Sequence, residues 1–240
     1  QLLSQEKNRK GLPLATAAGY LRDALAAVSH LHGIDIMHRD IKAENLLLDG
    51  KGRLKLSDFG WATLAKPPLH KRKTLCGTPE YAPPEMLVRL PKYTKAVDVW
   101  SLGVLAFELL TGQTPFAKPH ATSPKPTDGT PAGGTASPSP DGGFPTATAA
   151  SGADASLAAE VEAVHGRDNY AKLYGRIAGW GGSRESLFGP GTLGAGVPDR
   201  AVDVVMSMLR PRPRDRLESG AVLRLPWVAS RGKEADVAPA

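Results

Sequence analysis

Cysteine is almost absent from this sequence of 240 residues, which contains only Cys76. No disulfide can form within the chain, so the composition favours a reducing compartment. Long apolar runs are absent too, and none approaches the ~20 residues that a transmembrane helix needs. The first four residues, Gln1 to Ser4, show neither an initiator Met nor a signal-peptide pattern. We therefore expect no membrane partner, and a sequence that is a fragment of a longer protein or an incomplete gene product.

Aromatic residues are scarce at 6 %, whereas there are 26 Gly and 21 Pro, so part of the chain is expected to be loop or disorder. The formal net charge is +6. Basic residues are spread along the chain, apart from short clusters at Lys71–Lys73 and Arg210–Arg216. An acidic partner such as nucleic acid is one interpretation of this charge. The scatter favours an ordinary basic surface, and we do not expect a nucleic-acid partner.

The hydrophobic pattern predicts a mostly α-helical domain with one small β-hairpin. Between Thr16 and His32, apolar residues recur at the spacing of one helix face, and Gly33 would suit the C-terminal cap. A second helix, Asp98 to Leu110, is apolar on all sides and therefore predicted to be buried. Two short strands around a Gly-containing turn predict the hairpin, at 46–48 and 53–56. Further helices are expected at 170–177, 200–209 and 219–225, with a Gly-rich loop at 181–196.

One segment differs in composition from the rest of the chain. Residues 118–156 hold seven Pro, six Gly, five Ser and six Thr, and no Leu, Ile or Val. Such a stretch cannot bury enough apolar surface to offset the entropy of ordering, so it is predicted to be a disordered insert. The expected organisation is a first part of the domain at 1–117, the insert at 118–156, a second part at 157–229 and a tail at 230–240.

The stretch from His38 to Leu46 reads His-Arg-Asp-Ile-Lys-Ala-Glu-Asn-Leu, which matches the catalytic loop of protein kinases. Transfer of a phosphoryl group to a hydroxyl needs a carboxylate to orient that hydroxyl and accept its proton, a role that suits Asp40. Lys42 would place a cation near the transferred phosphate. The side-chain oxygen of Asn45 is a hard ligand for Mg²⁺. A solvated charged loop is the alternative. A match of this kind over nine residues is very unlikely to arise by chance, which argues against that alternative.

Asp58-Phe59-Gly60 follows the second predicted strand, thirteen residues after Asn45. Asp58 would bind the Mg²⁺ that bridges the nucleotide phosphates, and Gly60 would allow a sharp turn. A three-residue match alone is weak evidence, but its place beyond the hairpin strengthens it. Together these residues predict a site for ATP and Mg²⁺.

A third stretch, Thr74 to Tyr81 followed by Pro83-Pro84-Glu85, resembles the end of a kinase activation segment. A phosphate on Thr74 would pair with Arg39 of the catalytic loop and order the segment. Thr78 would bond Asp40 and Lys42. The alternative for Thr74 is an ordinary loop hydroxyl. Cys76 also has two interpretations: it is either a packing residue or a redox-sensing thiol near Lys71–Lys73.

These stretches together resemble the C-terminal lobe of Aurora-family Ser/Thr protein kinases, above all in Trp61 after Asp-Phe-Gly and in Pro83-Pro84-Glu85-Met86. The resemblance implies transfer of the ATP γ-phosphate to protein Ser or Thr hydroxyls. It assigns Asp40, Lys42 and Thr78 to catalysis and Asn45 and Asp58 to the metal. It assigns the nucleotide site to Lys42, Glu44, Asn45, Leu47 and Asp58.

The resemblance also implies two structural pairings and a biological setting. Asp98 would hold the catalytic-loop backbone, and Arg216 would pair with Glu85. Glu44 would meet a basic residue before the target Ser or Thr, so the expected partners are basic protein substrates and an activating protein. The implied location is the cytoplasm or nucleus, including the spindle.

Some features depart from this family or leave alternatives open. Ala43 replaces the usual Pro, and the residues around Glu80-Tyr81 are common to many Ser/Thr kinases, so a general basophilic kinase remains an alternative. Lys42 argues against a tyrosine kinase. Gly189 to Gly194 matches G-x-G-x-x-G, but it lies after the catalytic residues and contains Pro190, so we expect no phosphate binding there.

The sequence before the first predicted helix has no room for the Gly-rich loop and strand Lys of a kinase N-terminal lobe. We therefore expect this chain alone to be a poor catalyst. The alternative function is a non-catalytic, pseudokinase-like binding or scaffold protein.

Overall fold

The computed structural model describes residues 11–65, 78–88, 94–116, 159, 161–163 and 170–232. The predicted insert at 118–156 and the proposed phosphorylation site Thr74 lie outside these ranges. The described part is mostly helical with two small sheets, so the expected fold class is confirmed.

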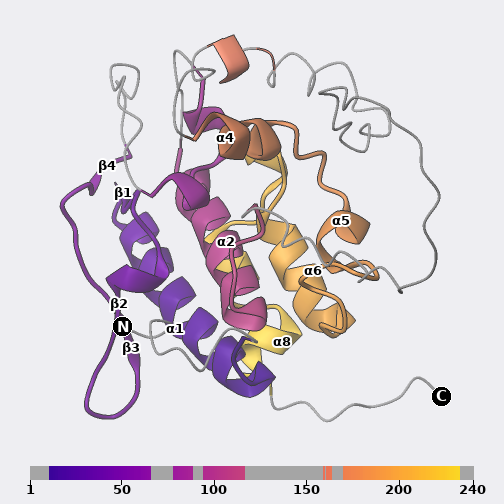
Figure 1. Ribbon diagram of the computed structural model, residues 1–240. Helices are drawn as coiled ribbons and strands as arrows, with labels where there is room; N and C mark the ends of the chain where they lie inside the picture. Colours follow the sequence, from indigo (N-terminus) through magenta and orange to yellow (C-terminus); the bar gives the residue numbers. More distant parts are fainter. Residues whose placement is uncertain are drawn as a thin grey trace, which may run out of the picture.

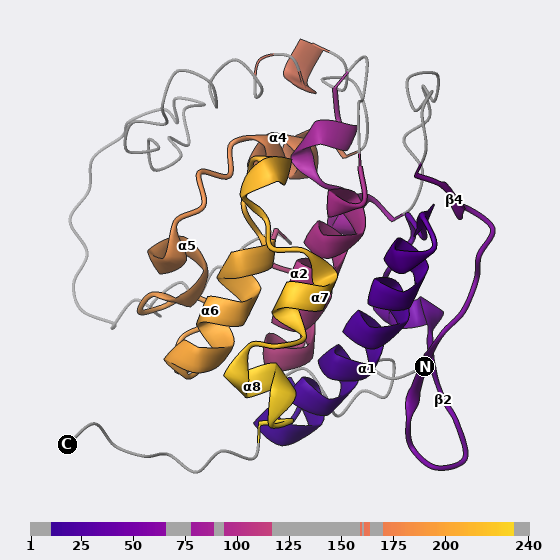
Figure 2. The same ribbon diagram turned by 180° about the vertical axis from the view of Figure 1, so that it is seen from behind.

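Helix α2, Ala96–Thr111, is the central element, and nearly all of its residues are buried. It is flanked by α1, Leu14–Gly33, and α6, Asp199–Met208, an arrangement visible from both sides of the molecule (Figures 1 and 2). Because neighbours surround α2, its sequence is apolar on every face, as predicted. It ends at Gly112, whose φ of 78° is the left-handed conformation that glycine adopts without strain.

The amphipathic pattern of α1 places Leu21, Leu25 and Val28 in the core, fully buried. The expected cap at Gly33 is wrong in detail. Gly33 is the last helical residue, Ile34 is the cap, and the left-handed residue is Asp35, with φ of 59°. Lys95 closes this end, because its Nζ donates to the His32 carbonyl oxygen at 2.5 Å and to Asp35 Oδ1 at 2.7 Å.

The remaining helices are short and complete the core around α2 and α6. Two of them differ from expectation: the Gly-rich stretch at 181–196 contains a helix, and the helix expected at 219–225 ends at Val222. The α-helices are α4 Ala171–Ala178, α5 Arg184–Phe188, α7 Ser219–Val222 and α8 Pro226–Ala229. The single-turn 3₁₀ helices are η2 Ala43–Asn45, η3 Pro79–Tyr81, η4 Pro84–Met86 and η5 Pro213–Asp215.

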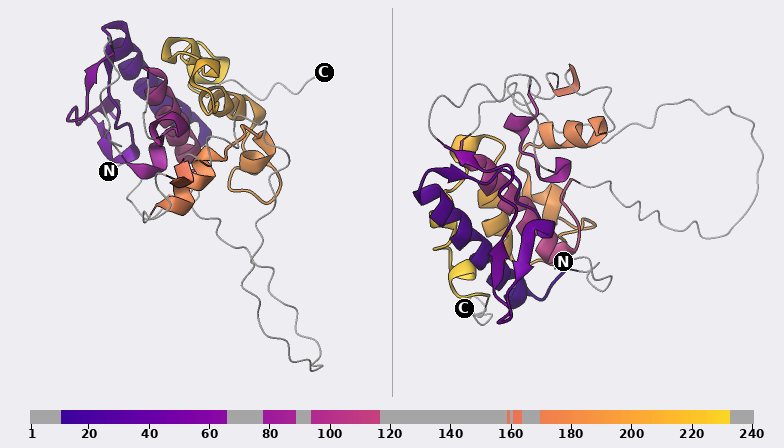
Figure 3. Two further views of the ribbon diagram at one scale, coloured as in Figure 1. Left: turned by 90° about the horizontal axis from the view of Figure 1, so that it is seen from above. Right: turned by 90° about the vertical axis from the view of Figure 1, so that its left-hand side faces the viewer.

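The predicted hairpin is present as β2, Leu46–Leu48, and β3, Leu54–Leu56, which pair antiparallel with Leu46 opposite Leu56. Asp49 builds the turn, since its Oδ1 accepts hydrogen bonds from the Lys51 and Arg53 N–H groups, both at 2.9 Å. A second pair, β1 Ile36–Met37 with β4 Thr63–Leu64, was not predicted. All four strands lie at one edge of the helical body, the side turned to the viewer in the right panel of Figure 3.

The G-x-G-x-x-G stretch folds onto itself rather than forming an open loop. The N–H groups of Thr192, Gly194 and Ala195 donate to carbonyl oxygens within or beside the stretch. Gly194 packs tightly, because a Cβ there would lie 2.5 Å from the Leu187 carbonyl oxygen. These donors are therefore already used and do not form a cradle for phosphate.

Within the described part of the chain, no helix has the length and apolar composition needed to cross a membrane.

The crossing of α2 and α6 generates a testable prediction at Gly103. A Cβ at this position would lie 2.8 Å from Leu209 Cδ2 and 3.0 Å from Met208 Cβ, so alanine would overpack the contact. We expect Gly103→Ala to lower the free energy of unfolding by about 1–3 kcal/mol. The measurement is chemical denaturation.

Gly175→Ala is the matched control, because Gly175 is also helical and a Cβ there would meet nothing within 4 Å. This control should be neutral or stabilising by up to about 1 kcal/mol, the usual effect of replacing a helical glycine. A Gly103→Ala variant as stable as the control would contradict tight packing at the crossing.

Candidate active site

The carboxylate of Asp98, in the first turn of α2, holds the loop that carries the predicted catalytic residues. Its Oδ1 accepts a hydrogen bond from the Arg39 N–H at 2.7 Å, and its Oδ2 accepts one from the His38 N–H at 2.9 Å. Asp98 has no exposed surface. The role that the family resemblance implied for Asp98 is therefore confirmed by geometry.

Arg39 has a φ of 67°, a left-handed conformation that a non-glycine residue adopts at a cost of about 1–2 kcal/mol. The N–H groups of His38 and of Arg39 itself both bind Asp98 and help to hold the backbone in that conformation. The Arg39 side chain is buried, and its Nε donates to the Trp61 carbonyl oxygen at 2.7 Å. The sharp turn at Arg39 directs the next residue, Asp40, into the interior.

Asp40, Lys42 and Asn45 form one hydrogen-bonded group. Lys42 Nζ lies 2.9 Å from Asp40 Oδ2, and Asn45 Nδ2 donates both to that oxygen at 3.0 Å and to the Asp40 carbonyl oxygen at 2.8 Å. The other carboxylate oxygen, Asp40 Oδ1, is buried and has no hydrogen-bond partner among the described residues. A buried acceptor without a partner is rare, and here it leaves one oxygen available to a hydroxyl.

The Asp-Phe-Gly stretch is tied to the catalytic loop through Ser57 and His38. Ser57 donates to the Asn45 carbonyl oxygen through both its N–H and its hydroxyl, each at 2.9 Å. The His38 ring lies against Phe59 edge to face at 5.0 Å, and its Nε2 is 3.1 Å from the Ser57 carbonyl oxygen. These contacts bring the metal candidates Asn45 and Asp58 into neighbouring stretches of backbone.

The donor chemistry of Asn45 and Asp58 fits Mg²⁺. Asn45 uses its Nδ2 within the loop, and no hydrogen bond among the described residues uses its Oδ1. Asp58 is exposed, with φ of 61°, and its Oδ1 accepts a hydrogen bond from the Gly60 N–H at 3.2 Å. Among the described residues, no three His, Cys, Asp or Glu side chains converge on one point. Two protein oxygens would therefore share the ion with phosphate oxygens and water, as Mg²⁺ sites commonly do.

The remaining predicted residues are less closely joined. Thr78 lines a small cavity with Asp40, but no hydrogen bond within the described residues joins its side chain to Asp40 or Lys42. Glu44 is exposed on η2, and Leu47 is 50 % exposed on β2. Thr74 lies outside the described residues.

A cluster of carboxylates beside the loop was only partly predicted. The Tyr81 hydroxyl donates a short hydrogen bond to Glu108 Oε2 and accepts one from the Ala43 N–H at 3.3 Å, so it joins α2 to the catalytic loop. Burial raises the pKa of Glu108 to about 7; the Tyr81 hydrogen bond opposes this shift, and the carboxylates of Glu44 and Glu80 add to it. Burial, followed by the charge of Glu108, also raises the pKa of Tyr81. Of these three carboxylates, the sequence assigned a binding role to Glu44 alone, because Glu108 reads as one residue of a buried helix.

The implied pair of Glu85 and Arg216 is confirmed. Both guanidinium NH groups contact the Glu85 carboxylate, at 2.6 and 2.7 Å, and the Arg216 side chain is fully buried. Arg216 also donates to the carbonyl oxygens of Ala96, Arg210 and Pro211. This bidentate pair, 131 residues apart in sequence, fastens the end of the activation segment to the C-terminal part of the fold.

Comparison with known families agrees with this geometry. The model of the protein kinase domain matches residues 1–228, nearly the whole chain, and the chain therefore belongs to the protein kinase domain family.

More specific similarity points to Aurora kinases. The Aurora kinase of Yarrowia lipolytica is 48 % identical over 113 residues, which are 47 % of this chain and 30 % of that relative. Aurora/IPL1-related protein kinase 2 of Caenorhabditis elegans is 48 % identical over 101 residues, 42 % of this chain and 32 % of its own length. The expected resemblance to Aurora-family Ser/Thr kinases is thus confirmed.

A relative with a different name matches at the same level. Serine/threonine-protein kinase YPK1 of Saccharomyces cerevisiae is 48 % identical over 103 residues, 43 % of this chain and 15 % of its own length. The chain spans about a third or less of these three curated relatives.

The raised pKa of Glu108 predicts a dependence of stability on pH. A carboxyl group that titrates near 4.5 when unfolded and near 7 when folded stabilises the fold in its protonated form. That contribution to the free energy of unfolding is at most roughly 3 kcal/mol. It is complete below pH 4.5 and is lost as the pH rises through about 7. Glu108→Gln keeps an uncharged side chain that can still accept from Tyr81, so this variant should not lose that stability.

The measurement is the free energy of unfolding from pH 4.5 to 8 for the unaltered protein and the variant. The two curves should meet near pH 4.5 and separate towards pH 7, where Glu108→Gln is the more stable. Exposed Glu218→Gln serves as the control and should leave the curve unchanged. Parallel curves for the unaltered protein and Glu108→Gln would show that Glu108 titrates normally.

Proposed function

We propose that the protein containing this chain transfers the γ-phosphate of ATP to Ser or Thr hydroxyls of other proteins. The observation that carries the proposal is the state of Asp40. Its carboxylate is buried, one oxygen is held by Lys42 and Asn45, and the other has no hydrogen-bond partner within the part of the chain that the structure describes. A fixed carboxylate with one open oxygen is suited to orient a hydroxyl for attack.

In the proposed reaction, the substrate hydroxyl donates its hydrogen bond to Asp40 Oδ1. As its oxygen bonds to the γ-phosphorus, the bond from that phosphorus to the β,γ-bridging oxygen breaks, and Asp40 takes the hydroxyl proton. The Lys42 side chain is 21 % exposed, so its charge can also face the transferred phosphoryl group. Thr78 lies on the wall of the small cavity that Asp40 also lines. It would complete the site by bonding Asp40 or Lys42 when substrate is bound.

Asn45 and Asp58 are proposed to hold Mg²⁺ against the nucleotide phosphates, with Leu47 and Glu44 contributing to the nucleotide side of the site. A Mg²⁺ ion held there would neutralise the charge that develops on the phosphate oxygens and the leaving group. The exposed Asp58 is reached directly from solvent, as binding of a nucleotide–metal complex requires.

Substrates with basic residues before the target hydroxyl suit the carboxylates beside the loop. Glu44, Glu80 and Glu108 come from three different elements, and the charges of Glu44 and Glu80 both act on Glu108. An arginine side chain would relieve this repulsion and form charge-assisted hydrogen bonds. We propose that Glu108 joins Glu44 in recognising such residues.

The family resemblance supports proposals about the setting of the protein. We infer an activating protein partner and a location in the cytoplasm or nucleus, including the spindle. We also propose that residues 118–156 form an insert between two parts of one domain, since both parts contribute to the same core.

The division of roles between two aspartates tests the proposed function in the complete protein. Asp40→Asn should lower kcat on the order of 100-fold or more and leave ATP affinity largely unchanged, because Asp40 acts on the hydroxyl. Asp58→Asn should instead weaken Mg²⁺–ATP binding. The measurements are steady-state kinetics with a basic peptide and nucleotide titration.

Asp215→Asn, an exposed change outside the site, is the control and should leave both quantities unaltered. Equal loss of nucleotide affinity in the Asp40 and Asp58 variants would contradict the assignment. A complete protein that binds nucleotide and peptide without turnover would be the non-catalytic binding protein instead.

Thr74 is proposed to be the activating phosphorylation site, with the phosphate meeting Arg39. Arg72 and Lys71 precede it at positions −2 and −3, so the segment itself has the proposed substrate pattern and would be modified by another molecule of the kinase. In the complete protein, Thr74→Ala should lower activity far more than Thr63→Ala, and Arg72→Ala should slow modification of Thr74. Phosphosite mapping after removal of phosphate and addition of ATP measures this; equal activity of the two Thr variants would refute the switch.

A further inference from the structure

Three exposed arginines, Arg210, Arg212 and Arg214, follow α6 at alternate positions of the chain. They form most of a basic cluster in the sequence that the proposed function does not use. The residues between them are prolines, and the fourth arginine of the cluster, Arg216, is the buried partner of Glu85. One loop therefore presents three arginines to solvent and one to the core. We call Arg210, Arg212 and Arg214 the arginine surface.

The backbone beneath the arginine surface is fixed by hydrogen bonds from within the fold. Arg216 donates to the Arg210 carbonyl oxygen at 2.8 Å and to the Pro211 carbonyl oxygen at 3.1 Å. In η5, the Asp215 N–H donates to the Arg212 carbonyl oxygen at 3.0 Å. The prolines restrict the backbone further, because their φ is locked by the ring. A partner that binds these arginines therefore does not have to order the loop that carries them.

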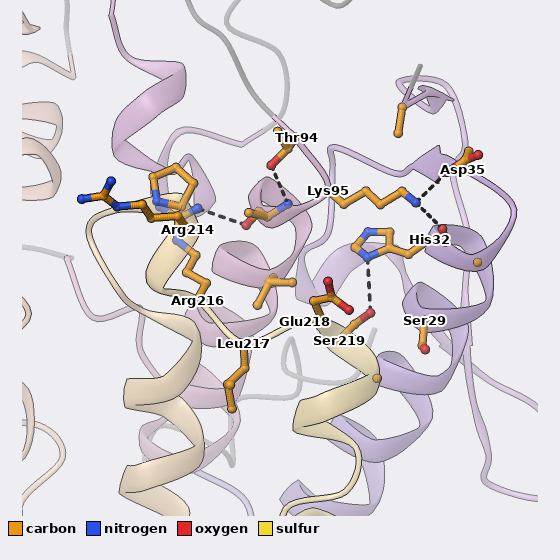
Figure 4. A pocket seen from close by; sticks show the side chains of 16 residues that line it. Ser29, His32, Asp35, Thr94, Lys95, Arg214, Arg216, Leu217, Glu218 and Ser219 are labelled. Atoms are coloured by element: carbon orange, nitrogen blue, oxygen red, sulfur yellow. Dashed lines mark hydrogen bonds and ion pairs between the residues drawn. The ribbon is translucent and has the colours of Figure 1, made fainter. Parts of the chain in front are cut away.

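The neighbouring charges leave two of the three arginines uncompensated. Among the described residues, the side chains of Arg210 and Arg212 form no hydrogen bond or ion pair. Arg214 Nε lies 3.8 Å from Asp215 Oδ1, and an exposed pair of this kind is weak. Glu218 is the next acidic residue and lines a cavity at the edge of the loop. Figure 4 shows the Arg214 guanidinium extending away from that cavity, so it too is open to a partner.

The size of the arginine surface favours an acidic protein segment over other anionic partners. A guanidinium forms two parallel hydrogen bonds with one carboxylate or phosphate, so a few arginines suffice to bind a short acidic segment. Proteins that bind DNA through its backbone commonly make about 6–10 phosphate contacts. Basic clusters that bind anionic lipid contain about 4–8 Lys or Arg. Three arginines are fewer than either of these partners requires.

We propose that the arginine surface is a docking site for an extended acidic segment of a protein partner, whose carboxylate or phosphate oxygens bind the guanidinium groups. The same loop holds Glu85 through Arg216, so a docked partner would sit beside the anchor of the activation segment. The proposal uses neither Asp40 nor Asp58. It therefore stands or falls independently of the proposed function.

The experiment measures binding of fluorescent peptides to the complete protein by anisotropy at low ionic strength. The probes are an oligoglutamate peptide, a peptide of the same length with phosphoserine at alternate positions, and an oligoglutamine peptide as the uncharged control. At least one of the acidic peptides should bind, more weakly as salt screens the charges, and the oligoglutamine peptide should not. Comparison of the two acidic peptides distinguishes carboxylate from phosphate as the preferred group.

The test variant combines Arg210→Gln with Arg212→Gln, which should lower the affinity for the bound peptide about 10-fold. The matched control combines Lys51→Gln with Lys172→Gln, which removes the same charge from two exposed lysines on other elements. This control should change the affinity less than about 2-fold. Bound peptide should also slow hydrogen exchange of the Asp215 amide, which lies within the loop.

Equal losses in the arginine variant and the lysine control would overturn the proposal, because net charge alone would then explain the binding. Failure of both acidic peptides to bind would overturn it too, as would unchanged exchange of the Asp215 amide in the complex. Duplex DNA and phosphatidylserine vesicles are tested in parallel. Tighter binding of either than of both peptides, lost in the arginine variant, would assign the surface to nucleic acid or membrane instead. If the Gln variant does not fold, Arg210→Lys with Arg212→Lys keeps the charge and should still weaken binding a few-fold, since an ammonium lacks the fork of donors; undiminished affinity there counts against the proposal.

Discussion

Two main-chain N–H groups of the catalytic loop end on the buried carboxylate of Asp98, and the geometry of the site depends on these bonds. Asp98 lies in the first turn of α2, where the positive end of the helix dipole favours a negative charge. Because α2 is enclosed on all sides, its position is fixed by the whole core, and the carboxylate transmits that fixed position to His38 and Arg39. The strained φ of Arg39 is maintained in this way, and so is the direction in which Asp40 points.

A second ionic contact fixes the other side of the site in the same manner. Arg216 is fully buried, binds Glu85 through both NH groups, donates to three carbonyl oxygens and lies over the Trp100 ring at 4.9 Å. Its donors are satisfied, which is the condition under which a buried ion pair is tolerated. Removal of one partner would leave a buried charge at a cost of about 3–5 kcal/mol. Ala96 and Trp100 belong to α2, so both anchors connect the segments around the active site to the same helix.

The parts of this arrangement that the sequence predicted are local. The apolar faces of α1 and α2 and the turn at Asp49 follow from spacings within a few residues, and Asp40, Lys42 and Asn45 lie within one loop. Less local features were found only through a family resemblance, as with Asp98 and the Glu85–Arg216 pair, or were missed. Ser219 is 187 residues from His32, and no periodicity brings them together. Glu108 reads as a polar break in a buried helix until Tyr81 is placed against it. The cap of α1 was misplaced because Asp35 adopts the left-handed conformation that the sequence suggested for Gly33.

The two aspartates of the site differ in a way that follows from how each is held. Asp40 is buried and bound by residues of its own loop, and that loop is anchored to α2, so its position is set before any substrate arrives. Asp58 is exposed, and among the described residues its carboxylate accepts only the N–H of Gly60 two residues later. In the proposed reaction Asp40 meets the reacting hydroxyl, and preorganisation is most valuable for that group, because a change of its position during the reaction adds to the barrier. A metal ligand that meets an ion already carried by the nucleotide gains its final position from that ion. The rigid core therefore fixes the position of Asp40 more firmly than that of Asp58. The hydrogen bonds from Ser57 to the Asn45 carbonyl oxygen keep the backbone before Asp58 close to the catalytic loop.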